Sequence, residues 1–399
     1  MNNVLIFEPH SIGHRMVYVR YLLRAMERRG GLRAILVTSL ESQSDPYVIA
    51  MTTEFGELLS IVTIEFPILA SGLLRFIHAR LAKQAATFRV LRSVVERLLS
   101  QTSVDYVFVP FLDDYCLFPM ALKRWPFRRL PWGGIAIRPR FHLHNMGAKV
   151  PTRWEDLIEK FAYHRLLRNR GLDRLFSIDP YLEPYFRDDK IASVPDPSDI
   201  FSVAPTHMQF GLPSDAVVLL VYGYLDVRKA IDRLMRAMLD ARVDTRLMLL
   251  LAGLQCPELS AFLTSDVAQV LRAQRRLVEI NRHISDVEEA AAFRRANIVW
   301  SYYPHNYCSS GALVRAGQSS RPVIATREGL VGLIVGELGM GVTVAEDDDE
   351  GLVMALVRLG NDAMLRAELG KAGFKHFSKA TAEAFGDRIV AQIAHVLGQ

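Results

Sequence analysis

The stretch VLIFEPHSIGHRMVYVRYLLRAMERRGGLRAILVT, residues 4–38, determines the fold that the sequence predicts. It begins with a short apolar run, Val4–Phe7, and a loop containing proline and glycine separates this run from residues 19–26. There, apolar residues recur every three or four positions, which is the spacing of one helix face, and Gly30-Gly31 ends the pattern. A second apolar run follows at residues 34–38. Because neither run alternates with polar residues, this order of strand, helix and strand indicates a parallel sheet with helices on both faces.

The same rhythm continues along the chain in two series. The first predicts further strands at 60–64, 105–110, 134–138 and 174–178 and a long basic helix at Leu73–Leu99. The second predicts strands at 217–222, 246–252, 277–281, 298–301, 322–325 and 341–345, with helices at 231–239, 287–295 and 311–319 and further helices to the C-terminus. The prolines at 195, 197, 205 and 213 indicate an interdomain connection between the two series.

The expected architecture is therefore α/β, with two Rossmann-like domains facing a cleft. Residues 1–200 form the N-terminal domain and residues 201–399 the C-terminal domain, and the last helix can pack back on the N-terminal one.

The composition is that of an ordinary globular protein of 399 residues, 50% hydrophobic and 23% charged, which argues against a disordered chain. The three cysteines lie far apart and show no metal-ligand spacing, so we expect neither a disulfide framework nor a zinc site. The N-terminus lacks the pattern of a signal peptide, and no apolar run approaches the roughly 18 residues of a membrane span. We expect a cytoplasmic protein that can associate peripherally with the inner face of a membrane.

The net charge of +5 is unevenly distributed, because Lys123–Arg129 and Arg165–Arg174 are locally basic. Such stretches attract nucleic acid, anionic lipid or phosphorylated small molecules, or they are simply solvated faces. The chain has no zinc finger, RNA-recognition signature or basic tail, so nucleic acid is not an expected partner. The basic helix Leu73–Leu99 could sit on anionic lipid, and an ordinary packed surface helix explains it equally well.

Ligands of parallel α/β sheets bind beyond the carboxyl ends of the strands, and three loops there carry unusual residues. In the first loop, Gly13 would let backbone amides approach a phosphate, with His14 beside it, or it would merely make the turn. In the second, Gly223 precedes the adjacent cations Arg228 and Lys229 at a helix start. An anionic ligand would resolve their conflict with the helix dipole; the alternative is a solvated pair near Asp226.

The third loop brings hydroxyl and amide groups to the start of a helix. Ser309, Ser310 and Gly311 form an anion-friendly geometry there, or the serines are simply N-caps. A further candidate lies in the N-terminal half. Asp113-Asp114 could form a metal-binding carboxylate pair, although no further ligand spacing supports it.

Together these loops resemble those of the retaining glycosyltransferases of the GT-B fold that share the "glycosyl transferases group 1" C-terminal domain. The family carries Gly-Arg-x-x-x-x-Lys-Gly after a strand, where residues 223–230 read Gly-Tyr-Leu-Asp-Val-Arg-Lys-Ala. Residues 321–326, Arg-Pro-Val-Ile-Ala-Thr, match a later family strand, and residues 369–378 resemble the family's terminal segment. The resemblance is clearest between Val217 and Val357. In the N-terminal half, Gly13 matches the family's glycine loop.

The resemblance implies roles for the individual residues. The donor-binding set would be Gly13, Gly223, Arg228, Lys229, Tyr307, Ser309, Ser310, Gly311 and Arg315. His142 resembles the family's sugar-contacting histidine, and it is the catalytic candidate together with His14. The alternative is that His142 is a structural histidine, either hydrogen-bonded inside the protein or on its surface.

The departures from the family pattern concern two acidic residues. The family's two donor-contacting glutamates fall on Tyr307 and Arg315, and neither replacement is an acceptor-only carboxylate. An arginine at the ribose side even permits a donor with extra negative charge. Tyr224 replaces the family's arginine, whose charge Arg228 could supply beside Lys229.

The leading hypothesis is a metal-independent glycosyltransferase without a cofactor. It would move a sugar from a nucleotide-sugar to a glycan or lipid-linked glycan acceptor in bacterial surface or exopolysaccharide synthesis. Two alternatives stay open. A non-catalytic GT-B subunit would explain the missing glutamates, and a nucleotide-sugar epimerase would draw acid–base groups from Glu8, His10 and His14.

Overall fold

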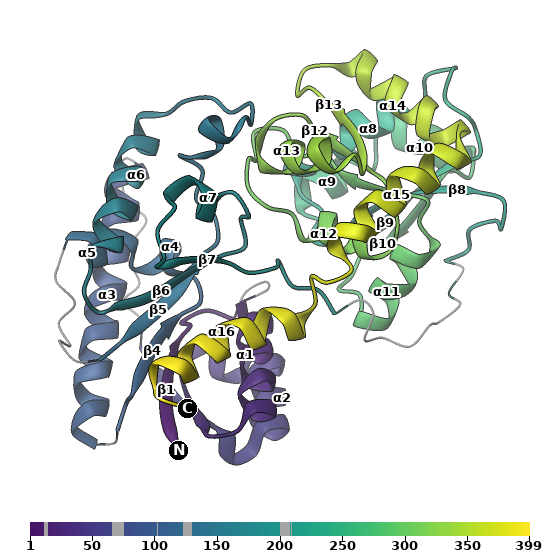
Figure 1. Cartoon of the computed structure of the whole chain (residues 1–399). Coiled ribbons are helices and arrows are strands. Elements are labelled where there is room, and N and C mark those ends of the chain that lie inside the picture. Colours follow the sequence, from purple (N-terminus) through teal and green to yellow (C-terminus); the bar gives the residue numbers. More distant parts are fainter. Residues whose placement is uncertain (12–14, 66–75, 102, 123–129, 200–207, 209) are drawn as a thin grey trace. The chain divides into compact units, whose positions relative to one another are not determined.

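The computed structural model describes residues 1–11, 15–65, 76–101, 103–122, 130–199, 208 and 210–399 (Figure 1). The chain divides into two compact units. Unit 1 comprises Met1–His142, Thr152–Asp196 and Ala382–Gln399, and unit 2 comprises Leu143–Pro151 and Pro197–Thr381. Each unit contains one parallel sheet covered by helices, which confirms the predicted α/β class.

The sheet of unit 1 has seven parallel strands in the order β3-β2-β1-β4-β5-β6-β7. These strands are β1 (Asn2–Phe7), β2 (Leu32–Ser39), β3 (Leu59–Ile64), β4 (Tyr106–Val109), β5 (Trp132–Ala136), β6 (Leu172–Ser177) and β7 (Ile191–Ser193). Leu5 of β1 lies opposite Ile35 on one side and Val107 on the other. The chain thus switches direction across the sheet between β1 and β4, and in such sheets ligands bind at the carboxyl end of that point.

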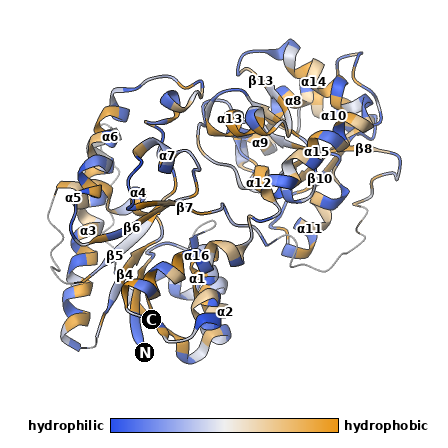
Figure 2. Ribbon diagram, viewed as in Figure 1, coloured by the Kyte–Doolittle hydropathy of each residue, from blue (hydrophilic) through white to orange (hydrophobic). Residues whose placement is uncertain are grey.

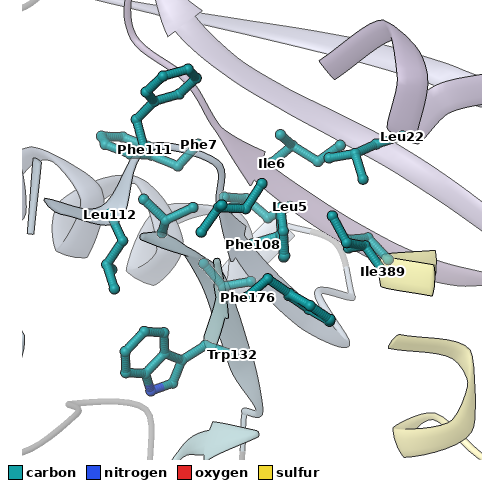
Figure 3. Packing of buried hydrophobic residues seen from close by; sticks show 14 of the residues in the cluster. Leu5, Ile6, Phe7, Leu22, Phe108, Phe111, Leu112, Trp132, Phe176 and Ile389 are labelled. Atoms are coloured by element: carbon teal, nitrogen blue, oxygen red, sulfur yellow. The ribbon is translucent and has the colours of Figure 1, made fainter. Parts of the chain in front are cut away.

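The helices and 3₁₀ turns of unit 1 are α1 (Arg15–Arg29), η1 (Glu41–Ser44), α2 (Pro46–Phe55), η2 (Gly56–Leu58), α3 (Phe76–Gln101), α4 (Leu112–Tyr115), α5 (Leu117–Leu122), α6 (Trp154–Leu167), α7 (Leu182–Phe186) and α16 (Ala382–Val396). Leu5, Phe108 and Phe176 from three strands form the centre of the core (Figure 3). Ile389 of α16 joins the same core, although it lies at the far end of the chain.

Close packing of α16 against α1 depends on Gly386. A Cβ at this position would lie 2.6 Å from the backbone oxygen of Tyr21 and 2.9 Å from Cβ of Ala25. Only glycine lets the two helix backbones approach this closely. The C-terminal helix is therefore an integral part of unit 1.

The sheet of unit 2 has six parallel strands in the order β10-β9-β8-β11-β12-β13. These strands are β8 (Val217–Tyr222), β9 (Leu247–Ala252), β10 (Leu277–Ile280), β11 (Ile298–Ser301), β12 (Val323–Thr326) and β13 (Gly341–Val344). Successive residues of β8 enter different cores: Leu219 and Val221 pack into one cluster, and Val218 and Leu220 into another. Both faces of the sheet are buried, as the unbroken apolar runs predicted.

Helices cover both faces of this second sheet. They are α8 (Ile231–Ala237), α9 (Pro257–Phe262), α10 (Asp266–Ala273), α11 (Asp286–Arg295), α12 (Gly311–Gln318), α13 (Gly329–Leu338), α14 (Asp349–Asn361) and α15 (Ala363–Phe377), with the 3₁₀ turn η4 (Val227–Lys229) before α8. Unit 2 also includes the segment Leu143–Pro151 with the turn η3 (Leu143–Met146), which the sequence division had placed in the N-terminal domain. The amide of Gly329 donates to the carbonyl oxygen of Lys149 at 2.9 Å.

Candidate functional site

In unit 2, the loops after β8 and β9 meet at the carboxyl edge of the sheet through two glycines with positive φ. Gly223 has a φ of 95° and Gly253 a φ of 142°. A Cβ on Gly253 would lie 1.9 Å from the carbonyl oxygen of Gly223, so no other residue fits there. The two loops therefore pack backbone against backbone at this part of the edge.

The loop that follows Gly223 is held by Asp226. One carboxylate oxygen of Asp226 accepts from the backbone amide of Arg228 at 3.1 Å, and the other lies 2.6 Å from the Arg228 guanidinium. Hydrogen bonding to Asp226 is the main cause that raises the pKa of Arg228. The predicted alternative, in which the arginine pairs with Asp226, is therefore what the structure shows.

Lys229 has different surroundings from its neighbour. Its carbonyl oxygen accepts from the indole N–H of Trp300 at 2.7 Å, which ties η4 to β11. Its ammonium lies 4.8 Å from the ring centroid of Tyr303, within range of a cation–π contact. Within the described residues Lys229 forms no salt bridge with a carboxylate. Its charge is thus available to an anionic ligand, whereas that of Arg228 is largely compensated.

The loop after β11 presents the start of α12. Ser310 occupies the N-cap position, but its hydroxyl makes no capping hydrogen bond; it donates instead to the Tyr303 hydroxyl at 3.4 Å. Ser309 is only half-buried. Ser310 is thus the N-cap residue of α12 by position, but its side chain does not cap the helix. The first amides of α12, beginning at Gly311, have no acceptor within their own helix, as at every helix start.

Tyr307 holds this loop against the start of α13. It is buried, and its carbonyl oxygen accepts from the amide of Leu330 at 3.0 Å. A Cβ at Gly329, whose φ is 78°, would lie 2.6 Å from Cα of Tyr307. The tyrosine at the position of the family's first glutamate is therefore buried, and its backbone contacts the start of α13.

Arg315, at the position of the family's second glutamate, pairs with an acidic residue that sequence reasoning missed. Its Nε donates to Glu289 of α11, and the Tyr222 hydroxyl donates to the other oxygen of the same carboxylate. A second arginine nitrogen donates to the carbonyl of Gly311 at 3.2 Å. The arginine side chain is 11% exposed and the glutamate 15%. Because Glu289 balances its charge, Arg315 has no excess charge to offer a more anionic donor.

At the carboxyl edge of the other sheet, in unit 1, the side chains of Tyr115 and Arg15 contact the buried carboxyl of Glu8. The Tyr115 hydroxyl donates to Oε1 of Glu8, and the guanidinium of Arg15 lies 3.6 Å from the same oxygen and 2.5 Å from Asp114. Oε2 of Glu8 has no hydrogen-bond partner within the described part of the chain. Burial raises the pKa of Glu8 to about 7 against the opposing charge of Arg15. The neighbouring candidates Gly13 and His14 lie outside the described residues.

His142 follows β5 and lies completely buried beside Asp179, which follows β6. Its Nε2 is 3.0 Å from Oδ2 of Asp179, and its ring packs against those of Phe141 and Tyr185. The residue is thus a buried histidine close to a carboxylate, and neither of its ring nitrogens makes a hydrogen bond within the described residues. Its catalytic role stays a prediction.

The adjacent carboxylates Asp113 and Asp114 have separate partners. Asp113 is buried and accepts from the amides of Ile137 and Arg138 at 3.1 and 2.6 Å, whereas Asp114 pairs with Arg15. Among the residues that the structure describes, no group of three or more His, Cys, Asp or Glu could hold a metal ion. Likewise, no helix in the described ranges has the length and apolarity to cross a membrane.

No family model matches the sequence. Among solved structures, sucrose-phosphate synthase from Thermosynechococcus elongatus superposes with a TM-score of 0.71 at 16% identity, and the match covers 100% of both chains. The chain has the GT-B fold. Two further GT-B structures cover it almost entirely. Anabaena HepE in complex with UDP has a TM-score of 0.65 at 12% identity, covering 99% of this chain and 100% of its own. WaaG, a glycosyltransferase involved in lipopolysaccharide biosynthesis, has a TM-score of 0.61 at 13% identity, covering 98% and 99%.

One curated relative adds sequence similarity to this GT-B likeness. It is a D-inositol 3-phosphate glycosyltransferase from Streptomyces avermitilis, 28% identical over 188 residues. That match spans 46% of this chain and only 39% of the relative. The resemblance that the motifs indicated is thus confirmed for the fold, while the replacement of the two family glutamates rests on the motif alone.

Proposed function

We propose that this GT-B protein is a glycosyltransferase that moves a sugar from a nucleotide-sugar donor to a glycan or lipid-linked glycan acceptor. The observation that carries the proposal is Lys229, whose ammonium has no carboxylate partner in the described chain and lies at the carboxyl edge of the unit 2 sheet. The curated relative's name as a glycosyltransferase and the UDP bound to Anabaena HepE support the same reading. WaaG, as a glycosyltransferase of lipopolysaccharide biosynthesis, supports a role in bacterial surface or exopolysaccharide synthesis.

The chemistry follows from the charge that develops during transfer. Cleaving the glycosidic bond to a nucleoside diphosphate leaves a diphosphate whose negative charge must be stabilised. Lys229 would supply a point charge, and the amides of Gly311 and its neighbours at the start of α12 would supply dipoles. Such groups can act without a metal ion and are already in place before the reaction begins.

The proposed donor site is smaller than the set implied by the motif. Gly223, Lys229, Ser309, Ser310 and Gly311 remain as groups that would contact the donor. Arg228 would contribute weakly because Asp226 compensates its charge. Tyr307 and Arg315 would support the loops of the site without contacting the donor.

A nucleotide-sugar epimerase is the second candidate, favoured by Glu8. A carboxyl whose pKa lies at about 7 can both accept and donate a proton near neutral pH, which sugar epimerisation requires. An epimerase changes the sugar of the donor without any acceptor, so the two candidates give different products.

The test is the thermal stability of the protein with UDP, GDP, ADP, TDP or CMP. A ligand present at about 100 times its Kd stabilises the folded state by about 2.7 kcal/mol. One nucleoside diphosphate should raise Tm, the shift should vanish in Lys229→Ala, and it should persist in Lys375→Ala, which removes an exposed lysine of the same unit. If no nucleotide raises Tm, the chain is better explained as a non-catalytic GT-B subunit.

Turnover then separates the remaining candidates. The nucleotide-sugar of the base that binds is incubated with and without EDTA, and the products are analysed. A transferase passes the sugar to an added glycan acceptor, or slowly to water, and releases the nucleoside diphosphate at a rate that should not fall with EDTA. Conversion of the nucleotide-sugar to its epimer would favour the second candidate.

A further inference from the structure

Helix α6 of unit 1 presents large hydrophobic side chains to solvent. Trp154, Leu157 and Phe161 are 60%, 68% and 57% exposed, and Ile158 between them is 36% exposed. Their spacing of three, four and seven residues places all four on one side of the helix. Isolated exposed hydrophobic residues are ordinary, but a contiguous stripe of this kind marks an interaction surface.

The other side of α6 is already packed into unit 1. Ala162, Tyr163, Leu166 and Leu167 are buried there. The helix therefore has two apolar sides, and unit 1 covers only one of them. Figure 2 shows hydrophobic and hydrophilic residues interspersed along α6.

The charges around the exposed stripe are mainly positive. Two acids of α6 are bound to unit 1: Asp156 lies 3.0 Å from Arg140, and Glu159 is buried 3.2 Å from Arg80. Glu155 is half-buried. The cations on or directly before α6 along this side are exposed and form no salt bridge within the described residues; they are Arg153, Arg165 and Arg168.

The basic helix that the sequence suggested for lipid contact is observed as α3, and its side chains from residue 80 onward lack the apolar component. Its side chains from residue 80 onward expose mainly polar groups such as Arg89, Arg92 and Arg97, while its apolar residues enter the core. Leu99 is the large hydrophobic side chain that it exposes within those residues. Charge alone attracts a helix to lipid, but stable attachment also needs inserted apolar side chains.

We propose that α6 binds the surface of an anionic membrane. The helix would lie parallel to the surface, with Trp154, Leu157 and Phe161 below the headgroups and Arg165 and Arg168 against the lipid phosphates. Tryptophan suits this depth because its ring is apolar and its N–H stays within reach of polar groups. The proposal does not depend on the chemistry assigned to unit 2.

A second copy of the chain is the competing occupant of this surface. A symmetric dimer through α6 would place the same cations of both copies in one contact. Of the three acids in the described helix α6, Asp156 and Glu159 already pair with cations of unit 1, which leaves Glu155 to balance them. An anionic lipid surface neutralises all of them at once. The observations therefore favour the membrane.

The experiment uses the full-length protein and vesicles of phosphatidylcholine alone or mixed with phosphatidylglycerol. Co-sedimentation should be strong with the mixed vesicles and should weaken without anionic lipid and at high salt. The variant Trp154→Ser/Leu157→Ser/Phe161→Ser should lower the partition coefficient at least about tenfold because it removes the inserted apolar area. Arg165→Glu/Arg168→Glu should abolish the preference for anionic lipid.

Matched controls make the test decisive. Met364→Ser removes an 85% exposed hydrophobic residue of unit 2 and should leave vesicle binding unchanged. Because the substituted residues of α6 are exposed, the triple variant should keep the wild-type Tm and nucleotide response, which separates this proposal from the proposed function. Equal vesicle binding by the triple variant and the wild type would overturn the proposal. A wild-type dimer that the triple variant converts to a monomer, without vesicle binding, would show that the surface joins two copies instead.

Discussion

Burial and ionisation oppose each other at Glu8. Its pKa of about 7 in the folded state lies above the ordinary value of 4.5, so the folded protein retains a proton that the unfolded chain releases between these pH values. Stability contributed by this group is therefore complete below pH 4.5 and is lost as the pH rises through 7. The loss amounts to about 3 kcal/mol, since each pKa unit corresponds to about 1.4 kcal/mol.

Glu8→Gln should remove this pH dependence. The amide keeps the shape of the protonated carboxyl but cannot ionise. The free energy of unfolding of the variant, measured by urea denaturation, should rise relative to wild type by about 3 kcal/mol between pH 4.5 and pH 8. Glu57→Gln, which changes an exposed glutamate of the same unit, is the control. Parallel stability curves for Glu8→Gln and wild type would show that Glu8 is ionised in the folded protein throughout.

Because Arg315 pairs with Glu289, replacing one of the two residues should destabilise the protein more than replacing both. Arg315→Met leaves the carboxylate of Glu289 half-paired with Tyr222 and should lower the free energy of unfolding by about 3 kcal/mol. The double variant Arg315→Met/Glu289→Gln removes both charges and should recover most of that loss. Urea denaturation of the two single variants and the double variant measures the coupling. Additive costs would mean that the two side chains do not interact.

The same pair shows what sequence reasoning could and could not find at the residue scale. Arg315 was found because it occupies a motif position, and Lys229 because two adjacent cations at a helix start require an explanation. Glu289 lies 26 residues from Arg315, and nothing in the local sequence links them. The partners of Arg228 were foreseeable, because Asp226 is only two residues away.

At the scale of elements, helix contacts decide where glycine is required. Gly386→Ala in α16 should lower the free energy of unfolding by about 1–3 kcal/mol, because the added Cβ would lie 2.6 Å from the backbone of α1. Gly336→Ala in α13 is the matched control: that glycine is exposed, and a Cβ there meets nothing within 4 Å. It should stabilise the protein by up to about 1 kcal/mol through helix propensity. Equal effects of the two substitutions in urea denaturation would contradict the close packing of α16 and α1.

Elements with strong periodicity were predictable and short ones were not. The strands at 217–222 and 298–301 have the predicted bounds because continuous apolar runs mark buried parallel strands. The three-residue strand β7 and the short helices α4, α5 and α9 were missed, since such segments are too short to show a period. Tertiary contacts, and not local propensity, define them.

At the scale of the whole molecule, the chain crosses between the units more often than a division at one residue suggests. Leu143–Pro151 belongs to unit 2, and local composition does not show this. The segment contacts unit 2 through the hydrogen bond from the Gly329 amide to the Lys149 carbonyl, and Gly329 lies far away in the sequence. The chain also leaves unit 2 at Thr381 and ends in unit 1 with α16. The stability of unit 1 therefore depends on a helix that follows unit 2 in the sequence.

This dependence can be tested by truncation. Removing residues 382–399 deletes Phe385, Ile389 and Ile393 from the core of unit 1 and exposes the apolar side of α1 that they cover. Amide hydrogen exchange should then accelerate in α1, β1 and β2, while β8 and β9 of unit 2 keep their protection, because each unit has its own core. Removing only residues 397–399 leaves these three side chains in place and should change neither unit. Equal loss of protection in both units after the longer truncation would mean that they unfold as one cooperative body, and α16 would then stabilise the molecule as a whole.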